Sequence, residues 1–215
     1  MAVTDNQRRR GPRVDVDVPT VLLNTAEELF GTHGVDNVSL RAIAREAGVA
    51  PAALTHHFPT KRDLLDSVVW RRGDRVAEDV RGRLRALGGR ADVSTRELVE
   101  AVLFPFVDEV NRDPADAVRW LRIVITLALS GDEIIASGVA GEGDITDLFT
   151  SAATGVPALQ ANSVELRAPI AMFSMLTALA AADLGGYGRP IGPAGLDPEY
   201  VEQLALFTSS GLQAG

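Results

Sequence analysis

The sequence predicts an all-α protein. Apolar residues recur along most of the 215-residue chain at the i, i+3, i+4 spacing of amphipathic helices, and no segment alternates like a half-buried strand. Glycine and proline stand between the helical segments, where helices end and begin. Because 46% of the residues are hydrophobic, the chain can build a large core, and its length suits a small domain followed by a larger one.

Composition excludes several classes of protein. The chain has no cysteine, which rules out disulfides, thiolate metal sites and cysteine nucleophiles. No segment reaches the ~18 uninterrupted apolar residues of a membrane span. The N-terminus is polar and arginine-rich and lacks the apolar segment of a secretory signal. We therefore expect a soluble, cytoplasmic protein.

Residues 39–58 are the most informative part of the sequence. Ser39 is typical of a helix N-cap, and Gly48 can adopt the positive φ that ends a helix. Pro51 suits the first turn of the next helix, where its missing N–H is not needed. Two short helices joined by so tight a turn are the outline of a helix-turn-helix DNA-binding motif.

Helices are also expected on both sides of this motif. We expect a first helix over about 19–32, closed by Gly31 and Gly34, and a long helix from Lys61 to about Leu87, ended by Gly88-Gly89. Pro105 predicts a kink within the next helix, because its ring and missing N–H disturb the helical hydrogen bonds. The later helices are predicted from Ser94 or Thr95 to Val110, from Pro114 to Leu129, weakly over 145–152, strongly over 163–184, and after Pro198.

Residues from about 22 to 65 resemble the tetracycline-repressor (TetR) family of bacterial regulators. The residues that carry the resemblance are Ala26–Phe30 (AEELF), Gly31, Gly34, Ser39, Ile43, Ala44, Ala47, Gly48, Val49, Leu54, His57, Phe58, Lys61, Leu64 and Leu65. Thr55 departs from the tyrosine usual in the family, and Ala52-Ala53 from its frequent Gly-Thr. The resemblance implies an N-terminal three-helix helix-turn-helix domain and a larger C-terminal helical domain that binds a ligand and dimerises.

Three segments follow from this resemblance and from composition. Residues 1–17 form a flexible arginine-rich arm, 18–65 the helix-turn-helix DNA-binding domain, and 66–215 the helical effector-binding and dimerisation domain. The arm is either a solvated tail or a contact to DNA phosphates or the minor groove. Residues 1–65 carry equal numbers of basic and acidic residues, so the net charge of −8 comes entirely from the remainder.

The candidate DNA contacts lie on the two motif helices and at the start of the long helix. Arg41 faces away from the buried residues and suits a guanine edge, the alternative being a solvent-facing arginine paired with Glu46. Lys61, the chain's one lysine, stands where a helix N-terminus and a cation both favour phosphate. The predicted set is Ser39, Arg41, Ala50, Pro51, Ala52, Ala53, Thr55, His56, His57 and Lys61.

No catalytic residue, metal site or cofactor is predicted. His56 and His57 are adjacent, so in a helix they point about 100° apart and cannot share a metal ion. His33 has no partner at i+4 and no nearby carboxylate motif. An all-α enzyme or a ligand-binding protein without DNA binding is therefore a distant alternative.

The last two long helices are the candidate dimer interface. Small residues repeat at helical spacing on the first of them and would let another helix approach closely, although an ordinary intrachain packing face would look the same. The family resemblance and the need for two half-site contacts favour a homodimer. The predicted interface residues are Ala171, Ser174, Ala178, Ala181, Tyr200, Leu204 and Phe207.

Bulky apolar residues of the second domain could line a ligand cavity near the Pro105 kink. Each residue taken singly would also suit an ordinary core position. The predicted lining is Trp70, Phe106, Trp120, Val124, Met172 and Met175. The whole sequence thus predicts a ligand-responsive regulator, a repressor in the first instance, that binds palindromic operator DNA as a homodimer and is released by a small apolar or amphipathic effector. A DNA-binding regulator without a ligand is the alternative.

Overall fold

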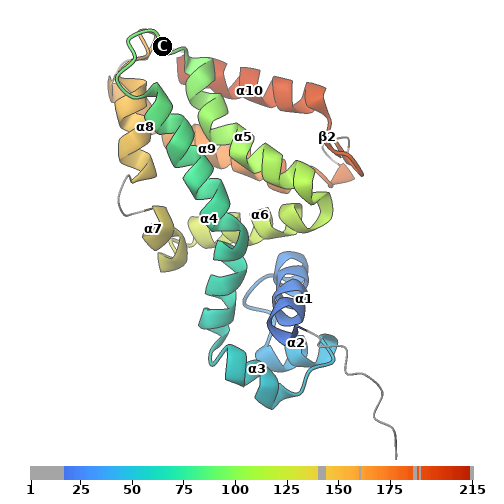
Figure 1. Ribbon diagram of the computed structural model, residues 1–215. Helices are drawn as coiled ribbons and strands as arrows, with labels where there is room; N and C mark the ends of the chain where they lie inside the picture. The colour runs from blue at the N-terminus through green and yellow to red at the C-terminus, as the bar shows by residue number, and fades with distance from the viewer. Residues whose placement is uncertain (1–16, 140–143, 160, 186–187, 189, 214–215) are drawn as a thin grey trace, which may run out of the picture.

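The computed structural model describes residues 17–139, 144–159, 161–185, 188 and 190–213, and within them the chain is helical apart from one short hairpin (Figure 1). The predicted arginine-rich arm, except Asp17, lies outside the described residues. The elements are α1 (Val18–His33), α2 (Leu40–Glu46), α3 (Pro51–His57), α4 (Lys61–Leu87), α5 (Thr95–Arg112), α6 (Pro114–Leu129), α7 (Glu133–Val139), α8 (Ile145–Ala153), α9 (Ala161–Ala180), β1 (Ile191–Gly192), β2 (Gly195–Leu196) and α10 (Pro198–Gln213).

Local capping sets where several helices begin. The Asp17 side chain accepts from the Thr20 N–H at the start of α1, and Ser39 accepts from the Ala42 N–H at the start of α2. Both α4 and α5 begin with a full capping box, Thr60 with Asp63 and Ser94 with Glu97. These caps explain why the helix starts expected from the sequence agree closely with the structure.

Helices α1, α2 and α3 share an apolar core with the first turns of α4, and we call this unit the N-terminal domain. Leu22, Phe30, Ile43, Leu54 and Leu64 are almost fully buried in this core. The core does not stop at the domain boundary, because Ile123 and Leu127 of α6 and Ile134 of α7 belong to it as well. The N-terminal domain therefore rests on α6 and α7.

The rest of α4 and the helices that follow it, which we call the C-terminal domain, have a second and larger core. Figure 1 shows α4 running from beside α3 upward, with α5 and α8 against its upper half, α10 on the far side of α5, and α9 against α6 and α10. Leu84, Leu98, Leu103, Leu121 and Leu179 are fully buried in this core. Because α4 is one continuous helix of 27 residues, it passes through both cores and joins the two domains without a loop.

The structure differs from the sequence expectations at four places. A helix, α7, lies over Glu133–Val139, which was not expected to be helical, and residues 191–196 form a two-residue antiparallel hairpin instead of a plain loop. Gly31 lies inside α1, and Gly34 alone, at φ 83°, ends it. The helix predicted to reach residue 184 ends at Ala180. Helix α5 runs through Pro105 without ending, and the kink expected there stays a prediction.

Gly31 allows the closest approach between the two domains. A Cβ at this position would lie 2.7 Å from the Cβ and 2.8 Å from the carbonyl oxygen of Arg119 in α6. Neither atom can rotate away, so a side chain would force α1 and α6 apart.

We expect Gly31→Ala to lower the free energy of unfolding by about 1–3 kcal/mol, the usual cost of overpacking. Gly82→Ala is the matched control, because Gly82 also lies inside a helix but has nothing within 4 Å of the added Cβ. The control should raise stability by about 0.5–1 kcal/mol through helix propensity. Urea unfolding of both variants measures the difference, and equal effects would contradict the close packing.

Candidate nucleic-acid interface

The turn between α2 and α3 has the geometry that the sequence predicts. Gly48 adopts φ 65°, and the Val49 N–H donates to the Ala44 carbonyl at 2.9 Å to close the turn. Pro51 occupies the first turn of α3, as expected from its missing N–H. The two helices and their turn form a helix-turn-helix in which α3 is the second helix.

Helix α3 buries one side and exposes the other. Leu54 and, just after the helix, Phe58 pack into the N-terminal core. Ala53 is half-buried, and the other predicted contacts on or beside α3 are exposed, namely Ala50, Pro51, Ala52, Thr55, His56 and His57. The Thr55 hydroxyl donates to its own helix, to the Pro51 carbonyl at 3.2 Å, and so keeps its lone pairs available to a donor. Ala52, Ala53 and Thr55 are small and uncharged, so the backbone of α3 can come close to a surface of matching shape.

Two arginines extend this surface on α2. Arg41 is exposed, and its side chain makes no hydrogen bond or ion pair with any described residue, so the pairing with Glu46 is not observed. Arg45 is also exposed and one turn further along the same face, a spacing of i, i+4 that sequence reasoning could have used but did not. Ser39, also exposed, uses its hydroxyl to cap α2.

Lys61 is the first residue of α4, beside the exposed helix N-terminus. Its ammonium nitrogen lies 5.9 Å from the centroid of the Phe30 ring, which positions the partly buried side chain. Its neighbour Arg62 points elsewhere and pairs with Asp132 at 2.8 Å. A backbone hydrogen bond from Ile134 and the bond from Arg62 hold the pKa of Asp132 below its usual range.

The histidines do not form a metal site in the part of the chain that the structure describes. His56 and His57 are in edge contact, with ring centroids 5.2 Å apart, and His33 lies in the last turn of α1. No three histidine or carboxylate residues are grouped to hold a metal ion among the described residues. Likewise, none of the helices in the described ranges is long and apolar enough to cross a membrane.

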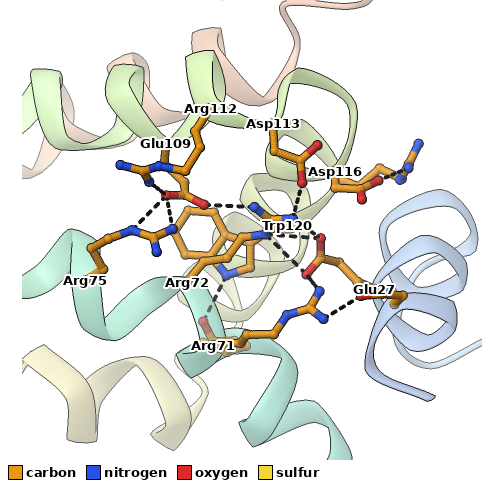
Figure 2. Close-up of polar contacts among 12 residues, drawn as sticks. Glu27, Arg71, Arg72, Arg75, Glu109, Arg112, Asp113, Asp116 and Trp120 are labelled. Carbon is orange, nitrogen blue, oxygen red and sulfur yellow. Dashed lines mark hydrogen bonds and ion pairs between the residues drawn. The ribbon is translucent and has the colours of Figure 1, made fainter. Parts of the chain in front are cut away.

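An ion-pair cluster fixes α1 against α4 and α5, and so fixes where the helix-turn-helix points (Figure 2). Arg72 of α4 binds Glu27 of α1 at 3.1 Å, Glu109 of α5 at 2.8 Å and Asp113 at 2.6 Å. Further arginines surround the two buried carboxylates, with Arg71 on Glu27 and both Arg75 and Arg112 on Glu109. We call Glu27, Arg72 and Glu109 the ionic junction.

The carboxylates of the ionic junction are almost completely removed from water. Glu27 and Glu109 are each 1% exposed and Arg72 is 9% exposed. Burial alone would raise the pKa of Glu109, but hydrogen bonds from Arg75 and Arg72 outweigh it and hold that pKa below its usual range. Sequence reasoning missed this cluster, since residues 45 and 37 positions apart carry no local signal of contact.

The structure does not bring the six predicted ligand residues together. Met172 and Met175 line a hollow of about 20 Å³ between α5, α8, α9 and α10. Trp120 is instead buried near the ionic junction, where its indole N–H donates to the Val69 carbonyl at 2.9 Å and its ring stacks on Phe106. Trp70 packs against the N-terminal core, and Val124 touches both cores. Binding of a ligand by any of these residues stays a prediction.

The predicted small-residue face of α9 mostly packs inside the chain. Ala171 lines the hollow, Ala178 accepts from the Tyr200 hydroxyl at 2.9 Å, and Ala181 and Leu204 are buried. Ser174 and Phe207 are exposed. Packing within the chain, the alternative to a dimer interface, therefore accounts for most of the small residues that repeat along α9. The large apolar side chains that α9 and α10 expose are Leu166, Ile170, Phe173, Leu206 and Phe207.

Comparison with known proteins places this geometry in a family. The family model described as bacterial regulatory proteins, tetR family, matches residues 22–68. Residues 22–68 therefore match the domain that defines the TetR family. The HTH-type transcriptional regulator UidR of Escherichia coli (strain K12) is 34% identical over 50 residues, 23% of this chain and 26% of that protein. The chain thus matches about a quarter of the length of this curated relative.

Solved structures show that the TetR fold extends over nearly the whole chain. A TetR-like transcriptional regulator from Rhodococcus sp. RHA1 is similar with a TM-score of 0.62 and 19% identity, over 94% of this chain and 96% of the other. AmtR of Mycobacterium smegmatis is similar with a TM-score of 0.61 and 23% identity, over 97% and 90%. Helices α1–α3 are therefore a TetR-type DNA-binding domain, and α4–α10 have the fold of the larger C-terminal domain.

We expect Glu109→Gln to lower the free energy of unfolding at pH 7 by about 3–5 kcal/mol, because it removes the buried carboxylate charge that binds Arg72, Arg75 and Arg112. Asp108→Asn is the control, since the exposed Asp108–Arg83 pair also joins α5 to α4 and should contribute only about 0–1 kcal/mol.

The Glu109 effect should depend on pH in one direction. A carboxylate whose folded pKa is lowered stabilises the protein above its unfolded pKa and loses that contribution as the pH falls through the folded pKa. The gap between the native protein and Glu109→Gln should therefore narrow below about pH 4. Urea unfolding from pH 7 to pH 3 measures it, and a gap independent of pH would show that the Glu109 charge does not stabilise the fold.

Proposed function

We propose that the protein is a transcriptional regulator that binds palindromic operator DNA as a homodimer and releases it when a small apolar or amphipathic molecule binds the C-terminal domain. The observation that carries the proposal is the exposed, small-residue surface of α3 beside the unpaired guanidinium of Arg41, on a TetR-type domain. Arginine suits guanine in a major groove, and a helix with small side chains can lie deep in it. The proposal includes no enzymatic step.

The phosphate contacts proposed for this surface come from its edges. Lys61 supplies a cation and α4 supplies free N–H groups at its first turn, which together favour an anion. Arg45, His56 and His57 are exposed nearby. Since the described N-terminal domain has few free cations, we expect modest affinity for each copy and a need for two copies on one duplex.

The dimer is proposed to form through the exposed apolar residues of α9 and α10. Leu166 and Ile170, 74% and 65% exposed, lie one turn apart on α9, and Phe207 of α10 is 74% exposed. Large exposed apolar side chains on two helices that pack against each other are typical of an interface. A two-fold axis through this surface would present two α3 helices to half-sites about 34 Å apart.

The effector is proposed to enter the hollow between α5, α8, α9 and α10. Its lining is apolar, with Val99 and Val102 of α5 facing Met172 and Met175 of α9. A volume of about 20 Å³ admits no more than a water molecule, so an effector must separate these helices to bind. Methionine side chains adapt their shape readily and favour such opening. A ligand that stabilises the open arrangement then shifts the population away from the DNA-binding one.

The small size of the hollow also favours a second candidate, a regulator that binds DNA without any effector. Both candidates share the DNA surface and the dimer. A screen of apolar and amphipathic compounds against the protein–DNA complex separates them, because release of DNA by a compound occurs only with an effector-responsive protein.

We expect Arg41→Ala and Lys61→Ala to weaken DNA binding in different ways. Losing Arg41 should cost about 1–3 kcal/mol on the preferred duplex and relax the preference at one base position. Losing Lys61 should weaken all duplexes alike and reduce the salt slope by about one unit. Selection of a duplex from a random library, followed by anisotropy titrations at several salt concentrations, tests both. Equal effects of Arg41→Ala on the selected and a scrambled duplex would remove Arg41 from base contact.

We expect Ile170→Arg to convert the dimer to a monomer at micromolar concentration, because the charge would be buried against its own copy across the two-fold axis. Leu129→Arg is the control, since Leu129 is 71% exposed at the end of α6, outside the proposed interface. Sedimentation equilibrium compares them. A dimer that survives Ile170→Arg and is lost in Leu129→Arg would move the interface to α6.

A further inference from the structure

We propose that the ionic junction of Glu27, Arg72 and Glu109 transmits the state of the C-terminal hollow to the helix-turn-helix. The inference rests on the proposed function, because it names how effector binding would reach the DNA-binding surface. Arg72 would act as a positioning residue, which sets the angle of α1 and touches neither DNA nor effector.

The junction is the place where three helices from both domains share one side chain. Figure 2 shows the Arg72 guanidinium between Glu27 of α1 on one side and Glu109 of α5 on the other. Its Nη2 lies 3.1 Å from Glu27 and 2.6 Å from Asp113, and its Nη1 lies 2.8 Å from Glu109. A displacement of α5 relative to α4 therefore changes the contacts that hold α1.

Because the ionic junction is buried, its arginine–carboxylate contacts either stay intact or break completely when the helices move. Glu27 and Glu109 are each 1% exposed, so water cannot replace a lost arginine contact unless the helices separate. Arg71 already shares Glu27 with Arg72, and Arg75 and Arg112 share Glu109, so each carboxylate keeps an arginine when Arg72 moves away. A cluster with Arg72 bound and the same cluster with Arg72 released are then the two states that coupling between sites requires.

Helix α1 carries any movement of Glu27 to the DNA-binding surface. Glu27 lies next to Ala26 and one turn before Phe30, and both of these residues are buried in the core that holds α2 and α3. Gly31 packs directly on the Arg119 backbone, so α1 cannot deform there and must move as a unit. Because Arg119 belongs to α6, this contact is the pivot about which α1 turns, and the α3 surface then changes its angle to the C-terminal domain.

Helix α5 connects the same junction to the hollow. Val99 and Val102 line the hollow, and Glu109 follows Val102 by seven residues, about 10 Å along a helix. Opening the hollow by moving α5 thus displaces Glu109 and Asp113. Pro105 lies between the two sites and removes one helical N–H donor, which makes this the easiest point of α5 to bend.

A double-mutant cycle on DNA binding tests the coupling. Ala171→Trp overfills the hollow and replaces the unidentified effector, and the probe is the duplex that the native protein selects from a random library. We expect Ala171→Trp to weaken binding about tenfold in the native background and less than about threefold with Glu27→Gln, which keeps the shape of the side chain and removes its charge. Asp108→Asn, which breaks an exposed α4–α5 pair, should leave the tenfold effect unchanged.

The inference would be overturned if Ala171→Trp weakened DNA binding equally with and without Glu27→Gln, or did not weaken it in either background. If Ala171→Trp does not fold, Ala168→Phe tests the same point, since Ala168 also lines the hollow. A native protein that selects no duplex would contradict the proposed function instead, and the junction is then decided by a measurement that needs no DNA.

That measurement is the distance between the two domains. The chain has no cysteine, so Glu46→Cys at the end of α2 and Glu199→Cys in the first turn of α10, both exposed, can carry two spin labels. Dilution with excess unlabelled protein leaves one labelled chain per dimer. We expect Glu27→Gln to broaden the distance distribution about twofold and Asp108→Asn to leave it at the native width. Equal widths in all three proteins would show that the junction does not position the N-terminal domain.

Discussion

The charged contact that joins the N-terminal domain to α4 and α5 is made by one guanidinium, that of Arg72. Water solvates separated charges well, so burying Arg72 with Glu27 and Glu109 is a poor way to gain stability, and an apolar cluster of the same volume would serve as well or better. What the charges supply is geometry. A planar guanidinium satisfies carboxylates from α1 and α5 in few relative positions of those helices, whereas an apolar contact tolerates many. Burial thus raises the free-energy cost of the ionic junction and at the same time restricts the relative positions of α1 and α5.

The charge distribution gives this orientation a second consequence. All of the net charge of −8 lies after residue 65, while residues 1–65 are neutral overall. A DNA duplex is therefore repelled more by residues 66–215 than by residues 1–65, so the charge favours approach from the part of the chain that exposes Arg41. Sequence reasoning that considered only the total charge would have argued against nucleic acid. The position of the charge along the chain reverses that conclusion.

The parts of the fold that the sequence predicts are those with local causes. Ser39, Gly48 and Pro51 each act within one helical turn, and their roles in capping and turning appear in the structure as expected. The ionic junction has no local cause, because Glu27 and Arg72 meet across 45 positions of sequence. The small-residue repeat of α9 leaves the predicted dimer interface undecided for another reason. Periodicity shows that a helix has a packing face, but it does not say whether the partner belongs to the same chain.

Helix α9 itself answers that question on physical grounds. Its alanines and methionines, such as Ala171 and Met175, face α5 and α10, while Leu166 and Ile170 face outward. A helix with apolar residues on opposite sides is typical of one that is covered on both. The inner cover is present in the chain. The outer one is not among the described residues, and a second copy is the partner that can supply it by the same surface, which is what two-fold symmetry requires. The inner face of α9 then borders the hollow, and its outer face forms the proposed dimer contact. A movement of this one helix would therefore link effector binding to the spacing of the two α3 helices.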